Sequence, residues 1–456
     1  MEQRASRATE AGLESPRDES PSPAVAGLLR RVAETEALPV RGTLRAVTGL
    51  ALEVALPGAR VGDLVVVRRR SGPLLAEVVA FREERLICLP YGPVEDLGPG
   101  DPVEPAAAAS GLPCSEELLG RVIDGFGRPL DGGPAVAGVP RPLRASPPPA
   151  LSRPRVDAPL PTGVRALDAL TTFGVGQRIG LFAGSGVGKS TLLGQIARYA
   201  SADVIVVGLV GERGREVNDF LETCLGEAGR ARSVVVVATG DEPALRRIRA
   251  ARAALAVAEH FRDAGRSVLL LVDSVTRYAR ALREVALATG ELPARRGYPP
   301  SALADLPVLL ERAGRAARGS ITAVFAILVE GDDLDEPIAD EVRGILDGHV
   351  VLDRGLADRG RWPAIDPLRS LSRVMPAVTD AEHRRHAGVL RAAIERYEAK
   401  RELIQLGAWR PGADPALDRA VAAAPAIEAF LGQRPDERAD FARTRAELQA
   451  LVGRVA

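Results

Sequence analysis

The stretch LFAGSGVGKST at residues 181–191 has glycines, a lysine and a hydroxyl at the spacing with which proteins bind phosphate groups. The glycines let successive backbone N–H groups turn inward around the phosphates, and the start of a following helix adds a favourable dipole. Lys189 is expected to contact the outer phosphates and Ser190 to ligate Mg²⁺. Ala183 replaces the first glycine of the strict pattern, but a methyl group at a strand end need not block the loop. The predicted nucleotide-binding residues of this loop are Gly184, Ser185, Gly186, Val187, Gly188, Lys189, Ser190 and Thr191.

The lysine of this loop is unusual for the chain. The sequence has 60 Lys and Arg residues, of which only Lys189 and Lys400 are lysines. A compact ammonium on a flexible stem suits a phosphate loop, whereas a planar guanidinium would not fit there. The retained lysine therefore supports the prediction of a phosphate-binding loop.

Two carboxylates follow buried strands and could complete a hydrolytic site. Asp273 ends the run SVLLLVD, at the carboxyl edge of a predicted sheet, where it suits coordination of Mg²⁺ through water. Glu212 follows the apolar run 204–210 and could polarise an attacking water molecule. Taken alone, Asp273 could be a solvated strand-end carboxylate and Glu212 a charge at a helix start.

The elements that must position these residues alternate between apolar strands and helices. Because the apolar runs are nearly continuous, they indicate strands buried on both faces of a mostly parallel sheet covered by helices. The runs are RIGLFA, DVIVVGLV, SVVVVAT, SVLLLVD and ITAVFAIL. The central part of the chain is therefore predicted to be an α/β nucleotide-binding domain built on a mostly parallel sheet.

The flanking regions differ from this pattern. Short β-rich runs over 41–103 predict a small closed barrel, and helices dominate after Pro376. Residues 120–155, rich in Gly and Pro, are interpreted as a linker. The predicted organisation is a disordered tail over 1–23, an amphipathic helix (24–38) and β-barrel domain over 24–108, a P-loop ATPase domain over 109–375, and a C-terminal helical domain over 376–456.

Composition narrows the possible partners and compartment. The net charge is zero over 456 residues, so nucleic acid is not the expected partner. Three scattered cysteines suggest neither a disulfide framework nor a zinc site. No apolar stretch approaches the roughly 20 residues that span a bilayer, and the N-terminus lacks a signal-peptide core. A cytoplasmic protein is expected.

Several long motifs resemble one family. The segments GERGREVNDF, LLLVDSVTRYARA, RRGYPPSALADLPVLLERAG, EGDD and ADEVRGILDGHVVLDR are similar to those of the export ATPases of flagellar and type III secretion systems. These enzymes are relatives of the catalytic subunit of the rotary F-type ATP synthase, so the resemblance implies a RecA-like fold for the central P-loop domain. The resemblance runs from about residue 25 to the C-terminus, and its central motifs are the most specific.

The resemblance implies roles for individual residues. Lys189 and Ser190 would be the phosphate-loop pair, and Glu212 the catalytic base. Arg213, beside that base, would be a supporting or phosphate-side contact. Asp273 would be the metal-side carboxylate, acting through water.

The segment WPAIDPLRSLSRVM, residues 362–375, resembles the one that presents an arginine finger. Arg373 would then be the finger, and Trp362 would lie against the adenine ring. Without the resemblance, Trp362 could be a core residue and Arg373 part of a surface ion pair. The implied catalytic residues are therefore Lys189, Glu212 and Arg373.

The function implied by the resemblance is that of an ATP-hydrolysing motor of a flagellar or virulence-type export apparatus, which unloads substrates from chaperones and energises secretion. The implied cofactors are ATP and Mg²⁺. The implied partners are further copies in a homohexamer, a stator-like regulatory protein at the N-terminus, a central stalk protein, a membrane export gate, and secreted substrates with their chaperones. The implied location is peripheral, at the inner face of the cytoplasmic membrane.

Three other functions share parts of the pattern. A rotary synthase subunit would carry an acidic loop that has no clear counterpart in TDAEHRRHAGVLRAAIERYEAKRELI. A Rho-like hexameric RNA translocase would need several stacking aromatics, whereas 41–103 has only Phe81 and Tyr91. A noncatalytic ring subunit would lack the base, so Glu212 argues against it. His383 and His386 are interpreted as part of a solvated helix face and not as a metal pair.

Overall fold

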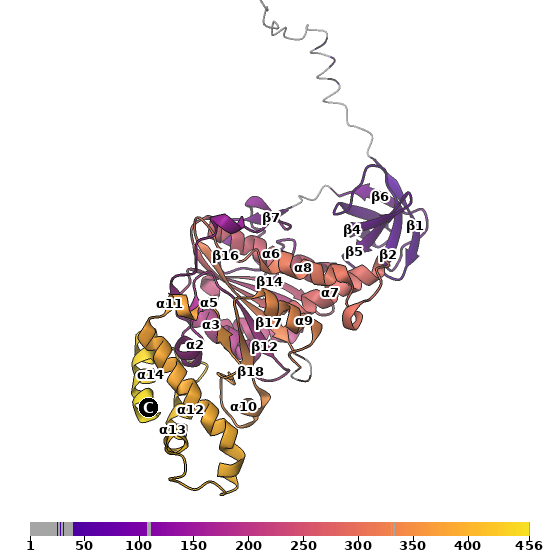
Figure 1. The fold of residues 1–456 in the computed structure, drawn as a ribbon. Coiled ribbons are helices and arrows are strands. Elements are labelled where there is room, and N and C mark those ends of the chain that lie inside the picture. Colours follow the sequence, from indigo (N-terminus) through magenta and orange to yellow (C-terminus); the bar gives the residue numbers. More distant parts are fainter. Residues whose placement is uncertain are drawn as a thin grey trace, which may run out of the picture.

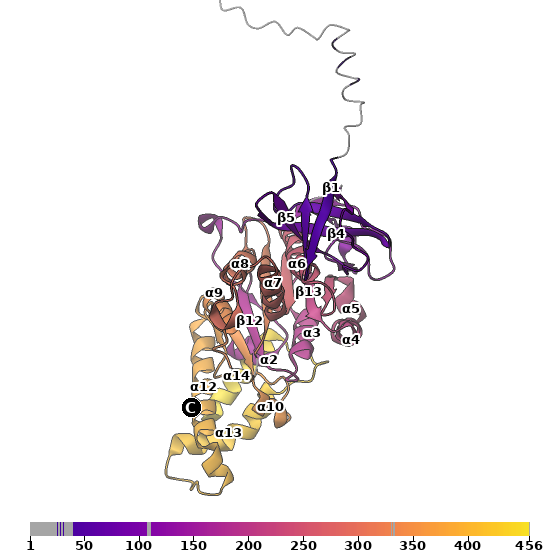
Figure 2. The same cartoon turned by 90° about the vertical axis from the view of Figure 1, so that its right-hand side faces the viewer.

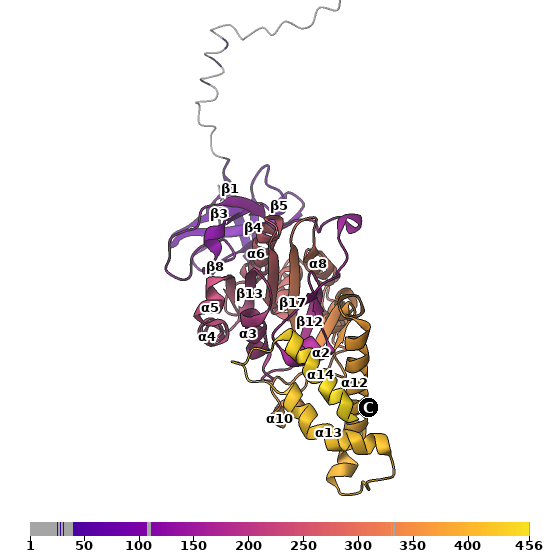
Figure 3. The ribbon, with the colours of Figure 1, turned by 90° about the vertical axis from the view of Figure 1, so that its left-hand side faces the viewer.

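The computed structural model describes residues 40–106, 111–329, 331 and 333–455, together with positions 25, 28 and 31. The expectation of a disordered tail over 1–23 lies outside these residues. The expected helix over 24–38 also lies outside them, except at its three described positions. Figures 1 to 3 show the N-terminal barrel and the C-terminal helices at opposite ends of a central α/β domain.

The N-terminal domain is a closed antiparallel barrel with the strand order β1-β2-β5-β4-β3-β6. Its strands are β1 (Gly42–Thr48), β2 (Ala51–Ala55), β3 (Leu64–Arg69), β4 (Gly72–Arg82), β5 (Arg85–Pro90) and β6 (Pro102–Pro105). Buried and less buried residues alternate along β3, where Val65 and Val67 are fully enclosed. This alternation is typical of a sheet that is closed around its own core. The barrel prediction is confirmed.

Within the described residues, the central domain contains a nine-stranded sheet with the order β19-β18-β12-β17-β15-β13-β14-β8 and β16 paired to β17. All pairs are parallel except those of β16 and β19. The strands are β8 (Val122–Asp124), β12 (Arg178–Ala183), β13 (Val204–Glu212), β14 (Ser233–Thr239), β15 (Ser267–Asp273), β16 (Gly314–Arg315), β17 (Ser320–Leu328), β18 (Gly348–Leu352) and β19 (Leu371–Ser372). The predicted parallel α/β fold is confirmed.

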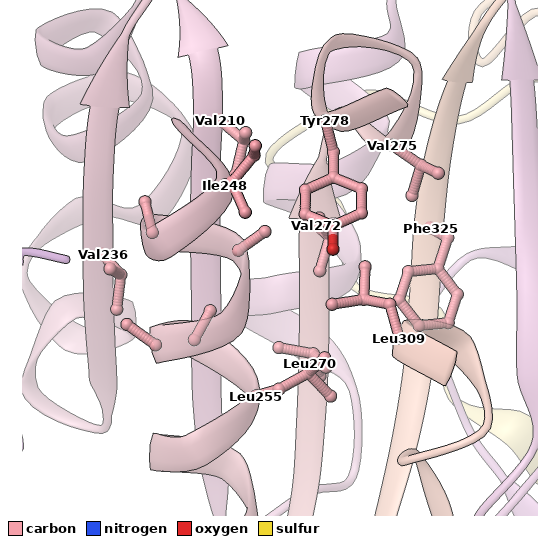
Figure 4. Close-up of a cluster of buried hydrophobic side chains, with 14 of the residues drawn as sticks. Val210, Val236, Ile248, Leu255, Leu270, Val272, Val275, Tyr278, Leu309 and Phe325 are labelled. Atoms are coloured by element: carbon pink, nitrogen blue, oxygen red, sulfur yellow. The ribbon is translucent and has the colours of Figure 1, made fainter. Parts of the chain in front are cut away.

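Helices cover both faces of this sheet. Along β13, Val206 and Val210 belong to the core on one face, whereas Ile205 and Val207 belong to the core on the other. Figure 4 shows the first of these cores, where Ile248 and other residues of the covering helices pack on the strands. The helices are α2 (Arg165–Leu170), α3 (Lys189–Tyr199), α4 (Gly214–Asp219), α5 (Gly226–Ala231), α6 (Ala244–Asp263), α7 (Val275–Ala288), α8 (Pro300–Leu310), α9 (Pro337–Ile345) and α10 (Arg354–Asp358).

Smaller elements complete the domain. Two short antiparallel ladders are β7 (Gly111–Cys114) with β9 (Val139–Pro142), and β10 (Pro159–Leu160) with β11 (Phe173–Gly174). Single helical turns lie at Glu116–Leu118, Ala150–Ser152 and Arg295–Gly297, and a π-helical segment spans Phe220–Leu225.

The interpretation of residues 120–155 as a linker is wrong for its first part. The strand β8 lies at the edge of the main sheet and pairs with β14, and Ile123 is fully buried. Arg121 Nε lies 2.8 Å from Asp131 Oδ2, and this ion pair holds the turn that follows β8. A three-residue strand leaves no periodic signal in the sequence, and its partner strand lies more than 100 positions downstream.

The C-terminal domain consists of α11 (Met375–Val378), α12 (Ala381–Gln405), α13 (Pro415–Leu431) and α14 (Phe441–Val455). Helices α12, α13 and α14 pack on α2, and Leu390 and Leu448 are fully buried between them. His383 and His386 are buried on this packed side, so their interpretation as a solvated face is wrong. The Nε2 atom of His383 lies 2.9 Å from the carbonyl oxygen of Ala169 in α2.

In the described part of the chain, no helix is both long and apolar enough to cross a membrane.

A buried ion pair joins α6 to the chain after α8. Arg312 donates to both carboxylate oxygens of Glu259, at 2.8 and 2.7 Å, and also to the carbonyl of Leu143. We expect Glu259→Gln to lower the free energy of unfolding by about 3–5 kcal/mol, because it leaves a guanidinium buried without its counter-charge. Urea unfolding measures this change.

A matched control is the exposed barrel pair Arg85–Glu53, for which Glu53→Gln should cost less than ~1 kcal/mol. Equal losses of unfolding free energy in the two variants would contradict a larger contribution from the buried ion pair to stability.

Candidate active site

The phosphate loop leaves the sheet at Ala183, between β17 and β18, and leads into α3, which begins at Lys189. Gly186 and Gly188 have φ angles of 79° and 85°, a left-handed conformation that glycine adopts without strain. Ala183 is 1% exposed and its methyl group packs in the core on the α2–α3 side of the sheet. The core therefore accommodates the methyl group, which explains why alanine is compatible with a phosphate-binding conformation.

The structure brings three of the predicted residues together at the carboxyl ends of the strands. Residue Leu209 of β13 pairs in register with Asp273 of β15, so Glu212 and Asp273 lie at the same edge of the sheet. Lys189 Nζ contacts Asp273 Oδ1 and lies 3.6 Å from Glu212 Oε1. All three side chains are nearly enclosed, which strengthens the electrostatic interactions between them.

Burial, together with the negative charge of Asp273, raises the pKa of Glu212 to about 7, although the Lys189 ammonium opposes this shift. A carboxylate with a pKa near neutrality is suited to accept a proton from water at physiological pH. The environment of Glu212 therefore fits the role of a general base.

Sequence reasoning missed Arg277, in the first turn of α7. Its Nε and Nη2 atoms lie 3.1 and 3.4 Å from the two carboxylate oxygens of Glu212. Gly211 leaves room for this arginine, since a Cβ atom there would lie 2.8 Å from Arg277 Cδ. The spacing offered a signal, because an arginine four positions after Asp273 falls on the first turn of a helix that starts at the same sheet edge. Arg354, which donates to the Ser185 carbonyl at 3.2 Å, was also missed.

Trp362 lies next to the loop. A Cβ atom on Gly188 would be 2.8 Å from Cζ3 of its ring, so the indole packs directly on the glycine backbone. Trp362 is 40% exposed, which excludes the core interpretation. The indole lines a pocket of about 1130 Å³ that extends from the loop to the C-terminal helices. That volume can accommodate a nucleoside beside the phosphate loop.

The remaining predicted residues are more exposed. Ser190 and Thr191 lie on the solvent side of the first turn of α3, where their hydroxyls can meet a bound phosphate or metal ion. The side chain of Arg213 is 75% exposed and pairs with Glu216 at 2.9 Å.

Arg373 is not brought to the phosphate loop of its own subunit. Its backbone N–H donates to the Asp347 carbonyl, and the Asp347 N–H donates to the carbonyl of Arg178, the first residue of β12. The loop begins after Ala183, the last residue of that strand, about 16 Å further along at ~3.3 Å per residue. The Arg373 side chain is exposed, and no carboxylate among the described residues pairs with it. The interpretation of Arg373 as part of a surface ion pair is therefore wrong.

Comparison with known proteins identifies the family. The model for the nucleotide-binding domain of the ATP synthase alpha/beta family matches residues 163–372, and that for the C-terminal domain of the type III secretion ATPase EscN matches 379–450. The flagellum-specific ATP synthase of Caulobacter vibrioides is 49% identical over 422 residues, which cover 90% of this chain and 95% of the relative. The chain belongs to the export ATPase family of flagellar and type III secretion systems.

Further relatives of this export ATPase come from type III secretion systems. The SPI-2 type 3 secretion system ATPase of Salmonella typhimurium is 48% identical, with 87% of this chain and 91% of the relative covered. The assembled ATPase EscN from enteropathogenic E. coli, a solved structure, matches with a TM-score of 0.86 and 45% identity, covering 90% of this chain and 100% of that chain. The predicted family, ATPase activity and export function are confirmed, and the synthase and RNA translocase alternatives are not supported.

The raised pKa of Glu212 predicts a pH dependence for the export ATPase. A base must be ionised to act, and a pKa near 7 means that Glu212 becomes protonated as the pH falls below about 7. We expect kcat/KM, which reports the free enzyme, to fall about tenfold for each pH unit below that point. Steady-state kinetics between pH 5.5 and 8.5 tests this, with the residual activity of Glu212→Gln as the control that should lack the inflection. A level profile of the wild-type protein over this range would contradict the assignment.

Proposed function

We propose that this export ATPase works as a homohexameric ring in which each nucleotide site lies between two subunits. The observation that carries the proposal is the position of Arg373, whose exposed side chain emerges near the first residue of β12, whereas the phosphate loop begins after the last residue, about 16 Å further along the strand. An exposed arginine without a counter-charge at that edge is suited to reach a site on a neighbouring copy. The likeness to EscN, solved in its assembled form, supports the same arrangement.

Within each site, the residues take separate roles. Lys189 binds the outer phosphates, Glu212 accepts a proton from the attacking water, and Arg277 holds the Glu212 carboxylate in place. Trp362 stacks on the adenine ring. Arg213, now paired with Glu216, is a supporting contact that can turn towards the phosphates.

Mg²⁺ is proposed as the metal cofactor, because the Ser190 hydroxyl and the Asp273 carboxylate form the oxygen donor set that this ion prefers. Asp273 would bind it through water. When bound, the ion neutralises charge on the phosphate oxygens.

The family supports a proposal for the partners and the location. EscN has been solved in complex with its central stalk EscO, and that structure matches this chain with a TM-score of 0.83. We propose a central stalk partner, a stator-like regulator bound to the N-terminal segment, a membrane export gate, and secreted substrates with their chaperones. The complex would lie in the cytoplasm against the inner face of the membrane.

An ATPase assay over a range of protein concentrations tests the ring. Specific activity should rise steeply as rings assemble, should require Mg²⁺, and should not respond to RNA. Activity that is constant from monomer to hexamer would contradict a shared site. Stimulation by RNA would favour a nucleic-acid translocase instead.

The proposed role of the N-terminal segment gives a further prediction. Deleting residues 1–38 should leave the melting temperature within about 2 °C of the wild-type value, because a segment that docks a partner contributes little to the folded core. Differential scanning calorimetry measures this, with loss of regulator binding as the positive readout. A large fall in melting temperature would mean that the segment belongs to the fold.

A further inference from the structure

One wall of the pocket beside Trp362 is formed by the chain between α13 and α14, residues 432–440, here called the connector. Four of its side chains line the pocket, and another wall is formed by the phosphate loop and the start of α3, with Gly186, Gly188 and Thr191. The four connector side chains are Gln433, Arg434, Pro435 and Glu437. The distance between these two walls sets the space available to whatever lies beside Trp362.

Three side chains at the end of α3 hold the connector. Gln195 Nε2 donates to the carbonyls of Arg434 and Glu437 at 3.2 Å each, and the Tyr199 hydroxyl donates to the Asp436 carbonyl at 2.9 Å. Arg198 donates to the carbonyl of Pro435, which lies between Arg434 and Asp436 in the chain. Residues spaced three and four apart lie on one face of a helix, so all of these bonds come from the same side of α3. Four consecutive carbonyls of the connector are therefore bound to a single helix.

The same helix carries the phosphate-binding lysine. Lys189 is its first residue and Tyr199 its last, and ten helical steps of 1.5 Å separate them by about 15 Å. An α-helix of this length is stiff, so its two ends keep a constant separation. The phosphate end of the site and the connector wall are thus placed relative to each other by one rigid element.

A second set of contacts holds the other side of the connector. The buried Gln433 side chain donates to the Gly163 carbonyl at 2.8 Å and accepts from the Arg165 N–H at 2.7 Å. Arg165 also pairs with Glu437. Because these bonds do not involve α3, loss of a single α3 contact should shift the connector without releasing it.

We propose that Gln195, Arg198 and Tyr199 are positioning residues for the nucleoside half of the substrate. They hold the connector wall at the distance from the phosphate loop at which a nucleoside fits beside Trp362. This inference rests on the proposed function, in which that pocket takes the base and ribose. Removing these contacts weakens binding that depends on the nucleoside, whereas binding of the phosphates at the opposite end of α3 is unchanged.

The test compares ATP with tripolyphosphate, which has the phosphates but no nucleoside. Both are titrated by calorimetry, with Mg²⁺ present, into the hexameric protein carrying Glu212→Gln so that hydrolysis does not interfere. Tyr199→Phe should raise Kd for ATP about two- to tenfold, as expected for one net hydrogen bond, and Gln195→Leu should raise it further. Kd for tripolyphosphate should stay within about twofold, as should kcat when the same changes are made in the wild-type background.

A matched control is Tyr91→Phe, which removes a tyrosine hydroxyl bound to Glu77 at the barrel and should leave both Kd values unchanged. Because Gln195 is 2% exposed, Gln195→Leu could fail to fold, in which case Tyr199→Phe alone carries the test. Unchanged ATP affinity in a folded Tyr199→Phe protein would overturn the inference. An equal loss of affinity for ATP and tripolyphosphate would also overturn it, because it would indicate a general disturbance of α3.

Trp362→Ala separates the assignment of the pocket to the nucleoside from the positioning role of the α3 contacts. If it raises Kd for ATP while Tyr199→Phe does not, the pocket takes the nucleoside but the α3 contacts do not position it. If Trp362→Ala leaves Kd for ATP unchanged, the assignment of the pocket itself is wrong and the inference fails with it.

Discussion

Replacing Glu212 with glutamine should leave ATP binding intact and lower turnover by about two to four orders of magnitude, the usual cost of losing a general base. The amide keeps the shape of the carboxylate and can still accept a hydrogen bond from Arg277, but it cannot take a proton from water. Lys189→Ala should behave differently and weaken ATP binding itself, because it removes the positive charge next to the outer phosphates. Calorimetric titration and single-turnover kinetics separate the two effects.

The matched control is Glu227→Gln, the same chemical change at an exposed position in the first turn of α5, which should turn over ATP normally. Near-normal turnover in the Glu212→Gln protein would remove Glu212 as the base. A large loss of ATP affinity in that variant would assign Glu212 a binding role instead.

The parts of the site that could be predicted are those that depend on short stretches of sequence. The phosphate loop is contained in eleven residues, and Glu212 and Asp273 each end an apolar run. Since the carboxyl ends of parallel strands meet at one edge of a sheet, a correct prediction of the sheet already brings these residues near one another. Their proximity follows from the strand pattern, whereas their catalytic roles stay predictions.

The parts that could not be predicted depend on tertiary packing. The contact between Arg277 and Glu212 requires the register of β13 against β15 and the open space at Gly211. The connector contacts join positions more than 230 residues apart, and they use backbone carbonyls, which every sequence has. The strand β8 was missed because a three-residue strand between glycines and prolines has the composition of a linker.

Arg373→Ala should lower the turnover of assembled rings by about three to five orders of magnitude, the effect of removing an arginine that stabilises charge developing on the transferred phosphoryl group. The structure gives the reason to expect this arginine to act on a neighbour, because it emerges near Arg178 at one end of β12, whereas the loop lies beyond Ala183 at the other. Supplying the charge from the next subunit would couple hydrolysis to assembly.

Mixing two inactive proteins tests this directly. In rings that contain both Glu212→Gln and Arg373→Ala subunits, some interfaces join the intact Glu212 of one subunit to the intact Arg373 of the next, and part of the activity should return. A random equal mixture of subunits in a cyclic ring would place such a pair at roughly one interface in four. The control mixes Lys189→Ala with Glu212→Gln, which damage the same half of the site, so no interface becomes complete and no activity should return.

Rings that native mass spectrometry shows to be mixed, and that stay inert, would mean either that Arg373 acts within its own subunit or that the sites fire only in concert. Comparing monomers and rings separates these two cases. If Arg373 acts only across the interface, monomeric Arg373→Ala and monomeric wild type should hydrolyse ATP equally slowly, while wild-type rings greatly outpace mutant rings. A loss of activity already present in the monomer would place Arg373 in its own site, which requires the chain between β18 and α11 to move far from the position that its hydrogen bond to Asp347 now holds.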